Sequence, residues 1–275
     1  MNAPIITTDW LNQHLNDPNL IILDASPTTN KSNLKADFEG LQIKGTRFFD
    51  LKKQFSDLTA EMPNTLPNPK AFEEAARTLG IKKQSKIVVY DNLGIYASPR
   101  VWWMFSTMGH QDIAVLDGGL PEWCKKGFEV EPKQTAIYEL GNFIARPNFK
   151  LKKDIADILQ NMEQKQALVL DARSAGRFNG TAPEPRAHLK SGRIPNSLNL
   201  PFPSVLNNGK FKSKKELQAI FNDLNISDQP LIFSCGSGLT ACVIMLAAEL
   251  VIKNEKAIYD GSWTEWAQKQ PMNIH

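Results

Sequence analysis

The residues best suited to chemistry lie in the loop at 235–240, which reads Cys-Gly-Ser-Gly-Leu-Thr. The apolar run at 231–233 predicts a buried strand before this loop, and the apolar residues at 241–252 predict a helix after it. Cys235 therefore stands where a strand ends and a helix begins. Unpaired N–H groups at a helix start attract anions and favour the thiolate form of a cysteine. The pattern predicts a cysteine nucleophile in an anion-binding loop.

The alternative is a buried structural cysteine after a core strand, which is a common place for this residue. Gly236 and Gly238 favour the loop interpretation, because they let the backbone turn tightly enough for several N–H groups to face the sulfur. Ser237 adds a hydroxyl beside it. A cysteine that only fills space in the core needs none of these neighbours. We therefore expect Cys235 to carry the chemistry.

Length and composition are those of a globular protein with two domains. The chain has 275 residues, of which 42% are hydrophobic and 22% are charged, so it can bury a sizeable core. A net charge of +3 is too small to indicate a nucleic-acid partner. No apolar stretch approaches the roughly 20 residues of a membrane span. The N-terminus shows neither a secretory signal nor an arginine-rich presequence. We expect neither nucleic acid nor a membrane as a partner.

The cysteines, Cys124, Cys235 and Cys242, form neither a metal-ligand spacing nor an even disulfide set. This usage is typical of a reducing compartment, and we expect a cytoplasmic protein. The sequence implies no metal and no cofactor. For two packed domains we expect a monomer.

Apolar runs alternate with helical patterns along most of the chain. Such alternation predicts an α/β fold in which a mostly parallel sheet is covered by helices. The predicted strands, besides the one before Cys235, lie at 20–24, 87–90, 113–116, 167–171 and 257–259.

An internal repeat relates the two halves of the chain. Leu-Asp-Ala-Ser at 23–26 matches Leu-Asp-Ala-Arg at 170–173, and Leu-Asp-Gly-Gly at 116–119 matches Tyr-Asp-Gly-Ser at 259–262. We therefore predict two copies of one α/β domain, at 1–135 and 150–275, joined by a linker at 136–149.

A third match, of Ile-Val-Val-Tyr-Asp at 87–91 with Leu-Ile-Phe-Ser-Cys at 231–235, places Asp91 of the first copy at the position of Cys235 in the second. A carboxylate cannot do thiol chemistry, and it would repel an anion. The domain at 1–135 should therefore be catalytically inactive, which leaves Cys235 as the single expected reaction centre.

Together, these features resemble the tandem rhodanese-domain sulfurtransferases over nearly the whole chain. The loop Cys-Gly-Ser-Gly-Leu-Thr is similar to that of the 3-mercaptopyruvate sulfurtransferases of this family. The thiosulfate-preferring rhodaneses carry bulky basic residues where Gly236 and Ser237 stand. The segment at 171–180 and Glu-Pro-Arg at 184–186 also match the mercaptopyruvate branch. The resemblance implies two tandem rhodanese-like domains, each with a central, mostly parallel sheet flanked by helices.

The resemblance also implies a reaction. Cys235 would take sulfur from 3-mercaptopyruvate as a persulfide, release pyruvate, and pass the sulfur to a thiol acceptor such as thioredoxin, or to cyanide. Arg177 and Arg186 match the arginines that bind the carboxylate and keto oxygen of the substrate, which suits the planar guanidinium. The alternative for each arginine is a surface ion pair with Glu184 or another nearby acid, and the motif matches favour the substrate role. Ser237 matches a serine that relays a proton. The remaining loop residues complete the implied substrate site: Gly236, Gly238, Leu239 and Thr240.

For Thr240 and Arg173 we expect structural roles ahead of contact with the substrate. Thr240 stands where it can cap the following helix, and this role is expected ahead of substrate contact. Arg173 follows a strand directly, and we expect it to tie its loop to the domain.

The sequence departs from the animal members of the family in one place. Some of those enzymes contribute an Asp and a His to the loop from the first domain, after Phe-Phe-Asp-Ile. Here the corresponding Phe-Phe-Asp-Leu at 48–51 continues with two lysines, and Ala60 and Glu61 stand near the expected histidine position. None of the four histidines fits. We therefore expect helix-start electrostatics and Ser237 to suffice for thiolate formation.

Other functions are weighed against the same loop. A cysteine phosphatase would need an arginine where Ala241 stands. A thiosulfate sulfurtransferase would use the same fold and cysteine, but the two charges of thiosulfate favour cations that Gly236 and Ser237 do not provide. A non-enzymatic persulfide carrier would hold a stable persulfide and show no preference among small donors.

Overall fold

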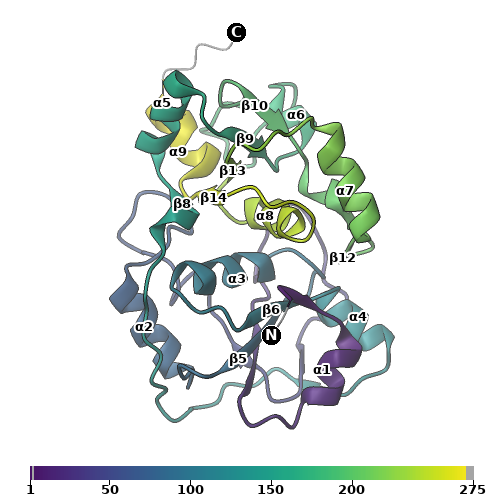
Figure 1. Cartoon of the computed structure of the whole chain (residues 1–275). Helices are drawn as coiled ribbons and strands as arrows, with labels where there is room; N and C mark the ends of the chain where they lie inside the picture. Colours follow the sequence, from purple (N-terminus) through teal and green to yellow (C-terminus); the bar gives the residue numbers. More distant parts are fainter. Residues whose placement is uncertain (2, 271–275) are drawn as a thin grey trace. The chain divides into compact units, whose positions relative to one another are not determined.

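The structure is a computed structural model that describes residue 1 and residues 3–270 (Figure 1). Residue 2 of the predicted first domain and residues 271–275 of the predicted second lie outside the described part. The chain forms two compact units. Unit 1 comprises Met1–Leu58, Leu66–Asn148 and Asn208–Phe211, and unit 2 comprises Thr59–Thr65, Phe149–Asn207 and the chain from Lys212 onward.

Unit 1 is built around a parallel sheet with the strand order β1-β6-β5-β2-β4. β2 and β5 are apolar runs whose residues are almost all buried, as expected for central strands of a parallel sheet. A short antiparallel pair, β3 with β7, lies outside this sheet. The elements of unit 1 are β1 (Ile5–Ile6), α1 (Thr8–His14), β2 (Leu20–Asp24), β3 (Leu41–Ile43), β4 (Arg47–Phe48), α2 (Pro69–Thr78), β5 (Lys86–Tyr90), α3 (Ser98–Thr107), β6 (Ile113–Leu116), α4 (Gly119–Lys125), β7 (Val130–Pro132) and β12 (Lys210–Phe211).

Unit 2 contains a second parallel sheet with the strand order β10-β9-β13-β14-β8. In Figure 1, α5 and α9 lie on one side of this sheet and α7 and α8 on the other. The elements of unit 2 are η1 (Phe149–Leu151), β8 (Lys152–Lys153), α5 (Ile155–Gln164), β9 (Leu168–Asp171), α6 (Ala175–Phe178), β10 (Ser197–Asn199), η2 (Phe202–Val205), β11 (Leu206–Asn207), α7 (Lys214–Asp223), β13 (Leu231–Ser234), α8 (Ala241–Glu249), β14 (Lys256–Tyr259) and α9 (Ser262–Lys269).

The two sheets share one topology. Read from its other edge, the second sheet runs β8-β14-β13-β9-β10, which matches β1-β6-β5-β2-β4 strand for strand in chain order. The predicted α/β fold with a duplicated, helix-flanked parallel sheet is therefore confirmed. None of the described helices is long and apolar enough to cross a membrane.

The core of unit 2 explains why β13 is held in place. Ile232 of β13 packs in a buried cluster with Val169 of β9, Ile158 of α5 and Trp263 of α9. Because side chains alternate across a strand, Leu231 and Phe233 face the opposite side, where α8 contacts the strand. The strand that leads to Cys235 is thus fixed on both faces.

The helix starts follow local sequence signals. Ser213 and Glu216 form a capping box at α7, and the Asn68 side chain caps α2, which has Pro69 in its first turn. The prediction of a helix over 241–252 is too long, because α8 ends at Glu249 and only residues 250 and 251 continue as a turn. Residues 133–148, which include most of the predicted linker, form neither helix nor strand.

Candidate active site

Cys235 lies directly after β13, at the carboxyl end of a strand that pairs with β9 on one side and β14 on the other. Its side chain is only 1% exposed. Residues 236–240 form bends and a turn before α8 begins at Ala241. The predicted position of the cysteine between a strand and a helix start is confirmed. Ligands of open α/β sheets bind at the carboxyl ends of the strands.

Ser262 holds the cysteine loop from the neighbouring strand-to-helix turn. Its Oγ accepts hydrogen bonds from the N–H groups of Cys235 (3.2 Å) and Gly238 (3.1 Å), and its hydroxyl donates to the carbonyl of Tyr259 (2.9 Å). Ser262 has a φ of 51°, in the left-handed region that a side chain enters only at a cost. Two loop N–H groups are therefore committed to Ser262 and do not face an incoming anion.

The internal repeat carries a sequence signal for Ser262. The repeat aligns this serine with Gly119 of the first copy, which has a φ of 53°. A glycine adopts this conformation freely, whereas a serine there needs a compensating contact. The hydrogen bonds of its hydroxyl to the cysteine loop supply that contact.

Gly238 fits the predicted tight turn of the cysteine loop, whereas Thr240 does not cap α8 as predicted. Gly238 has a φ of 76°, so its lack of a side chain is required by the turn. Thr240 occupies the N-cap position of α8, but its side chain makes no capping hydrogen bond. The capping role predicted for Thr240 is therefore wrong in its side-chain part. The backbone of Thr240 has helical angles, φ −74° and ψ −15°, rather than the extended ones that aim a capping hydroxyl at the first turn.

Arg177 and Arg186 both belong to unit 2, where the cysteine loop also lies. Arg177 at the end of α6 pairs with Glu184 at 2.6 Å, and a β-carbon added at Gly236 would lie 3.0 Å from its Nη2 atom. Arg186 is half-buried, and the charge of Cys235 acts on it. Burial lowers the pKa of Arg186, and the negative charges of Cys235 and Glu184 act in the opposite direction.

The contacts of the Arg186 guanidinium differ from those of the two neighbouring arginines. Within the described part of the chain, it makes no ion pair and no hydrogen bond, unlike Arg177 and Arg173. A half-buried cation without a partner is costly unless a ligand supplies the missing negative charge. The site thus combines a buried thiol with a free guanidinium suited to a small carboxylate.

Arg173 and Glu184 form the framework behind these arginines. The Arg173 side chain is fully buried and bonds to Asp171 (2.6 Å), to Glu184 (2.9 Å) and to the carbonyl of Gly192 (2.6 Å). Its guanidinium also lies 4.2 Å from the ring centre of Trp263. The contacts agree with the predicted role of Arg173 in tying its loop to the domain. Glu184 bridges Arg173 and Arg177, so it also orients the arginine beside Gly236.

Substituting Glu184 with alanine should destabilise unit 2 strongly. It would leave Arg177 without its carboxylate and the buried Arg173 with Asp171 as its remaining ion-pair partner, and breaking a buried ion pair by removing one partner costs about 3–5 kcal/mol. Urea denaturation measures this loss. Glu163→Ala on the exposed side of α5 is the matched control and should change the unfolding free energy by less than about 0.5 kcal/mol. Equal losses for the two variants would show that the bridge contributes nothing.

In unit 1, the loop that corresponds to the cysteine loop holds a carboxylate instead. One oxygen of the buried Asp91 accepts hydrogen bonds from the N–H groups of Tyr96 (3.0 Å), Ala97 (2.8 Å) and Ser98 (2.9 Å), and the other accepts from Leu93 (3.0 Å). Burial raises the pKa of Asp91, while these hydrogen bonds oppose the shift. The N–H groups of this loop are therefore already occupied by a carboxylate of the chain itself.

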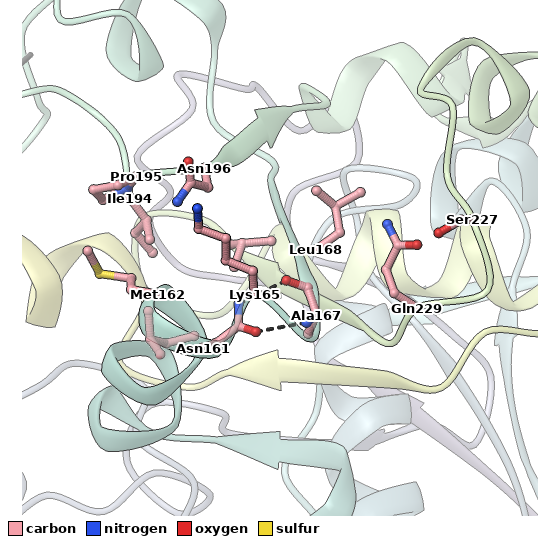
Figure 2. Close-up of a pocket in the computed structure, with 12 residues that line it drawn as sticks. Asn161, Met162, Lys165, Ala167, Leu168, Ile194, Pro195, Asn196, Ser227 and Gln229 are labelled. Atoms are coloured by element: carbon pink, nitrogen blue, oxygen red, sulfur yellow. Dashed lines mark hydrogen bonds between the residues drawn. The ribbon is translucent and has the colours of Figure 1, made fainter.

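A cavity of about 440 Å³ in unit 2 is separate from the cysteine loop (Figure 2). Its lining includes Leu168 at the start of β9 and Gln229 just before β13, so it lies at the amino ends of the strands. Cys235 follows the carboxyl end of β13. Among the residues that the structure describes, no cluster of three or more histidine, cysteine, aspartate or glutamate side chains could hold a metal ion.

Comparisons with known proteins find one family over most of the chain. The rhodanese-like domain matches twice, at residues 7–126 and 154–269. The chain is 37% identical to the 3-mercaptopyruvate sulfurtransferase of Escherichia coli K12, over 98% of this chain and 96% of that one. It is 39% identical to the thiosulfate sulfurtransferase of Rattus norvegicus, over 97% and 93%. The crystal structure of SseA from E. coli, described as a 3-mercaptopyruvate sulfotransferase, matches with a TM-score of 0.82 and 34% identity, over 95% of this chain and 99% of that one.

Proposed function

Because the chain belongs to the rhodanese-like domain family and carries the domain twice, we propose that it is a sulfurtransferase that uses 3-mercaptopyruvate through a persulfide on Cys235. The observation that carries this proposal is the half-buried guanidinium of Arg186, which has no ion pair among the described residues and on which the charge of the buried Cys235 acts. A donor with a carboxylate next to its reactive sulfur would supply the missing charge. Its sulfur would then be held at the nucleophile.

The first step moves one sulfur atom. The Cys235 thiolate attacks the sulfur of 3-mercaptopyruvate, an S–S bond forms, and the C–S bond of the donor breaks. The electron pair of that bond passes to the carbon fragment as an enolate, and the proton of the donor thiol ends on its carbon to give pyruvate. In the second step an acceptor thiolate attacks the outer sulfur, which leaves with the acceptor and restores the Cys235 thiolate.

Overall identity does not decide between the two donors, because relatives of both kinds match the chain about equally well. Local geometry favours 3-mercaptopyruvate. Gly236 leaves room for the Arg177 guanidinium, whose Nη2 atom would be 3.0 Å from any β-carbon at this position. No basic side chain stands at 236 or 237 to attract a dianion.

Replacing Gly236 with lysine should change the donor preference. The new side chain would displace Arg177 and add a positive charge beside Cys235, so the kcat/KM for 3-mercaptopyruvate should fall by about tenfold or more, the effect of roughly 1.4 kcal/mol. The kcat/KM for thiosulfate should rise. Steady-state assays of both donors measure the change. Ala219→Lys, at an exposed position of α7, controls for added charge, and an unchanged donor ratio in Gly236→Lys would contradict the role of Gly236.

The acceptor, the assembly and the compartment belong to the same proposal. A thiol such as that of thioredoxin would accept the outer sulfur, since Cys235 lies in a loop and needs only a second thiolate to attack. Cys124, Cys235 and Cys242 are all free thiols, which suits a reducing compartment such as the cytoplasm. We propose that the protein acts there as a monomer, with unit 1 as an inactive copy.

The experiment that tests the function compares the donors directly. Pyruvate release from 3-mercaptopyruvate with a thiol acceptor is measured beside thiocyanate formation from thiosulfate and cyanide. A clear preference for 3-mercaptopyruvate is expected. A preference for thiosulfate would overturn the donor assignment, and no turnover with either donor would favour a persulfide carrier.

A further inference from the structure

A segment from the first half of the chain contacts the cysteine loop within unit 2. The side-chain Nδ2 atom of Asn64 lies 3.0 Å from the hydroxyl oxygen of Ser237 and 3.2 Å from its carbonyl oxygen. The two residues are 173 positions apart in the sequence. Asn64 lies in the segment Thr59–Thr65, which belongs to unit 2.

The carbonyl contact fixes the direction of both hydrogen bonds. A backbone carbonyl only accepts, so the atom of Asn64 that faces Ser237 is the amide nitrogen and not the amide oxygen. The amide nitrogen only donates, so the Ser237 hydroxyl oxygen must be the acceptor of the second bond. The proton of the hydroxyl and its other lone pair are then left for a different partner.

The backbone around Asn64 is built to hold this position. Asn64 has a φ of 61°, a left-handed conformation that asparagine tolerates better than most residues. Pro63 restricts the chain on one side, and the hydroxyl of Thr65 closes the turn with a bond to the carbonyl of Met62 (2.8 Å). An ion pair between Glu61 and Lys269 of α9, at 3.8 Å, adds a second attachment of the segment.

We propose that Asn64 is a positioning residue that orients the Ser237 hydroxyl for proton transfer during the 3-mercaptopyruvate half-reaction. This inference rests on the proposed function. With one lone pair held by Asn64, the hydroxyl oxygen accepts the proton of the donor thiol on its other lone pair and gives its own proton to the enolate carbon. The C–S bond breaks, the S–S bond forms, and Ser237 is regenerated as a neutral hydroxyl.

The donors differ in their need for this proton. With 3-mercaptopyruvate, a carbon atom must be protonated before pyruvate leaves. With thiosulfate, the Cys235 thiolate takes the outer sulfur and sulfite leaves as an anion, so no proton transfer is required. A defect in the orientation of Ser237 should therefore reduce turnover of one donor and spare the other.

Asn64→Asp is the decisive variant, because aspartate has nearly the same shape and also tolerates a left-handed backbone. Its carboxylate accepts instead of donating, so it would claim the Ser237 proton. We expect kcat for 3-mercaptopyruvate to fall by about 10- to 100-fold, which reaches the lower end of the roughly 10²- to 10⁴-fold that proton transfer by a positioned group contributes. The kcat for thiosulfate should change by less than about threefold. As pH falls toward about 4, protonation of the new carboxyl restores a donor, so the ratio of variant to native kcat should rise.

Asn196→Asp is the matched control. Asn196 has the same φ of 61°, but it lines the cavity at the amino ends of the strands (Figure 2). This variant should behave like the native protein with both donors.

A second arm separates orientation from packing. In a Ser237→Ala background, Asn64→Ala should cause no further loss with 3-mercaptopyruvate, because the two residues act on one step. Additive losses, or equal losses with both donors, would overturn the proposal and leave Asn64 a purely structural residue. If the native protein does not release pyruvate from 3-mercaptopyruvate, the proposed function fails. If the native protein turns over 3-mercaptopyruvate and Asn64→Asp does so equally well, only the role of Asn64 fails.

Discussion

Replacing Cys235 with serine is expected to abolish sulfur transfer from both donors. A hydroxyl cannot form the persulfide, and no other cysteine of unit 2 can replace the thiol, because Cys242 is fully buried in α8 and donates to the carbonyl of Gly238. Loss of a catalytic nucleophile lowers turnover by roughly 10⁴-fold or more. Steady-state release of pyruvate and of thiocyanate measures the effect.

The control for this variant is Cys124→Ser. Cys124 lies in α4 of unit 1 and is half-buried, so its replacement should leave both activities near the native level. Since Cys235 and serine differ by one atom, circular dichroism and thermal unfolding of Cys235→Ser should match the native protein. Residual turnover of more than about one percent, in a folded Cys235→Ser variant, would place the nucleophile elsewhere.

Replacing Arg186 with glycine is expected to have the second largest effect, and a selective one. Its guanidinium is half-buried, the charge of Cys235 acts on it, and it has no ion-pair partner within the described residues, so the carboxylate of 3-mercaptopyruvate is its expected counterion. Removing one member of such a charged, hydrogen-bonded pair costs about 2–5 kcal/mol, which is roughly 30-fold to several thousand-fold in kcat/KM. Thiosulfate has no carboxylate, so its kcat/KM should fall by a clearly smaller factor.

Arg193→Gly is the matched control for the loss of a positive charge from unit 2. Arg193 is exposed and lies over the ring of Phe178 at 5.5 Å. Both donors should be turned over by this variant as by the native protein. Equal losses on 3-mercaptopyruvate and thiosulfate in Arg186→Gly would mean that Arg186 does not recognise the carboxylate.

Much of this arrangement could be predicted because it depends on local signals. The parallel sheets follow from buried apolar runs such as those of β5 and β13, and the duplication follows from matched segments at a nearly constant spacing. The place of Cys235 follows from a strand, two glycines and a helix in succession. Each of these signals is carried by neighbours in the chain.

What the sequence did not reveal depends on contacts between distant segments. Ser262 and Asn64 are 27 and 173 residues away from the loop residues that they contact. Glycine at 119 could have pointed to the strained backbone at Ser262, but nothing near Asn64 indicates that it meets Ser237. The lack of an ion pair at Arg186 among the described residues also could not be predicted. Glu184 is close in sequence to both Arg177 and Arg186, and it is the fold that pairs this glutamate with Arg173 and Arg177.

The central claim is that sulfur passes from 3-mercaptopyruvate to Cys235 as a persulfide, and a single-turnover experiment tests it most directly. The protein is mixed with excess 3-mercaptopyruvate and no acceptor, and the pyruvate released per chain is quantified. The masses of the peptides are then measured by mass spectrometry. The account predicts a burst of one pyruvate per chain, one extra sulfur atom on the peptide that contains Cys235, and loss of that sulfur when a thiol is added. A missing burst, or an extra sulfur on the peptides of Cys124 or Cys242 alone, would contradict it.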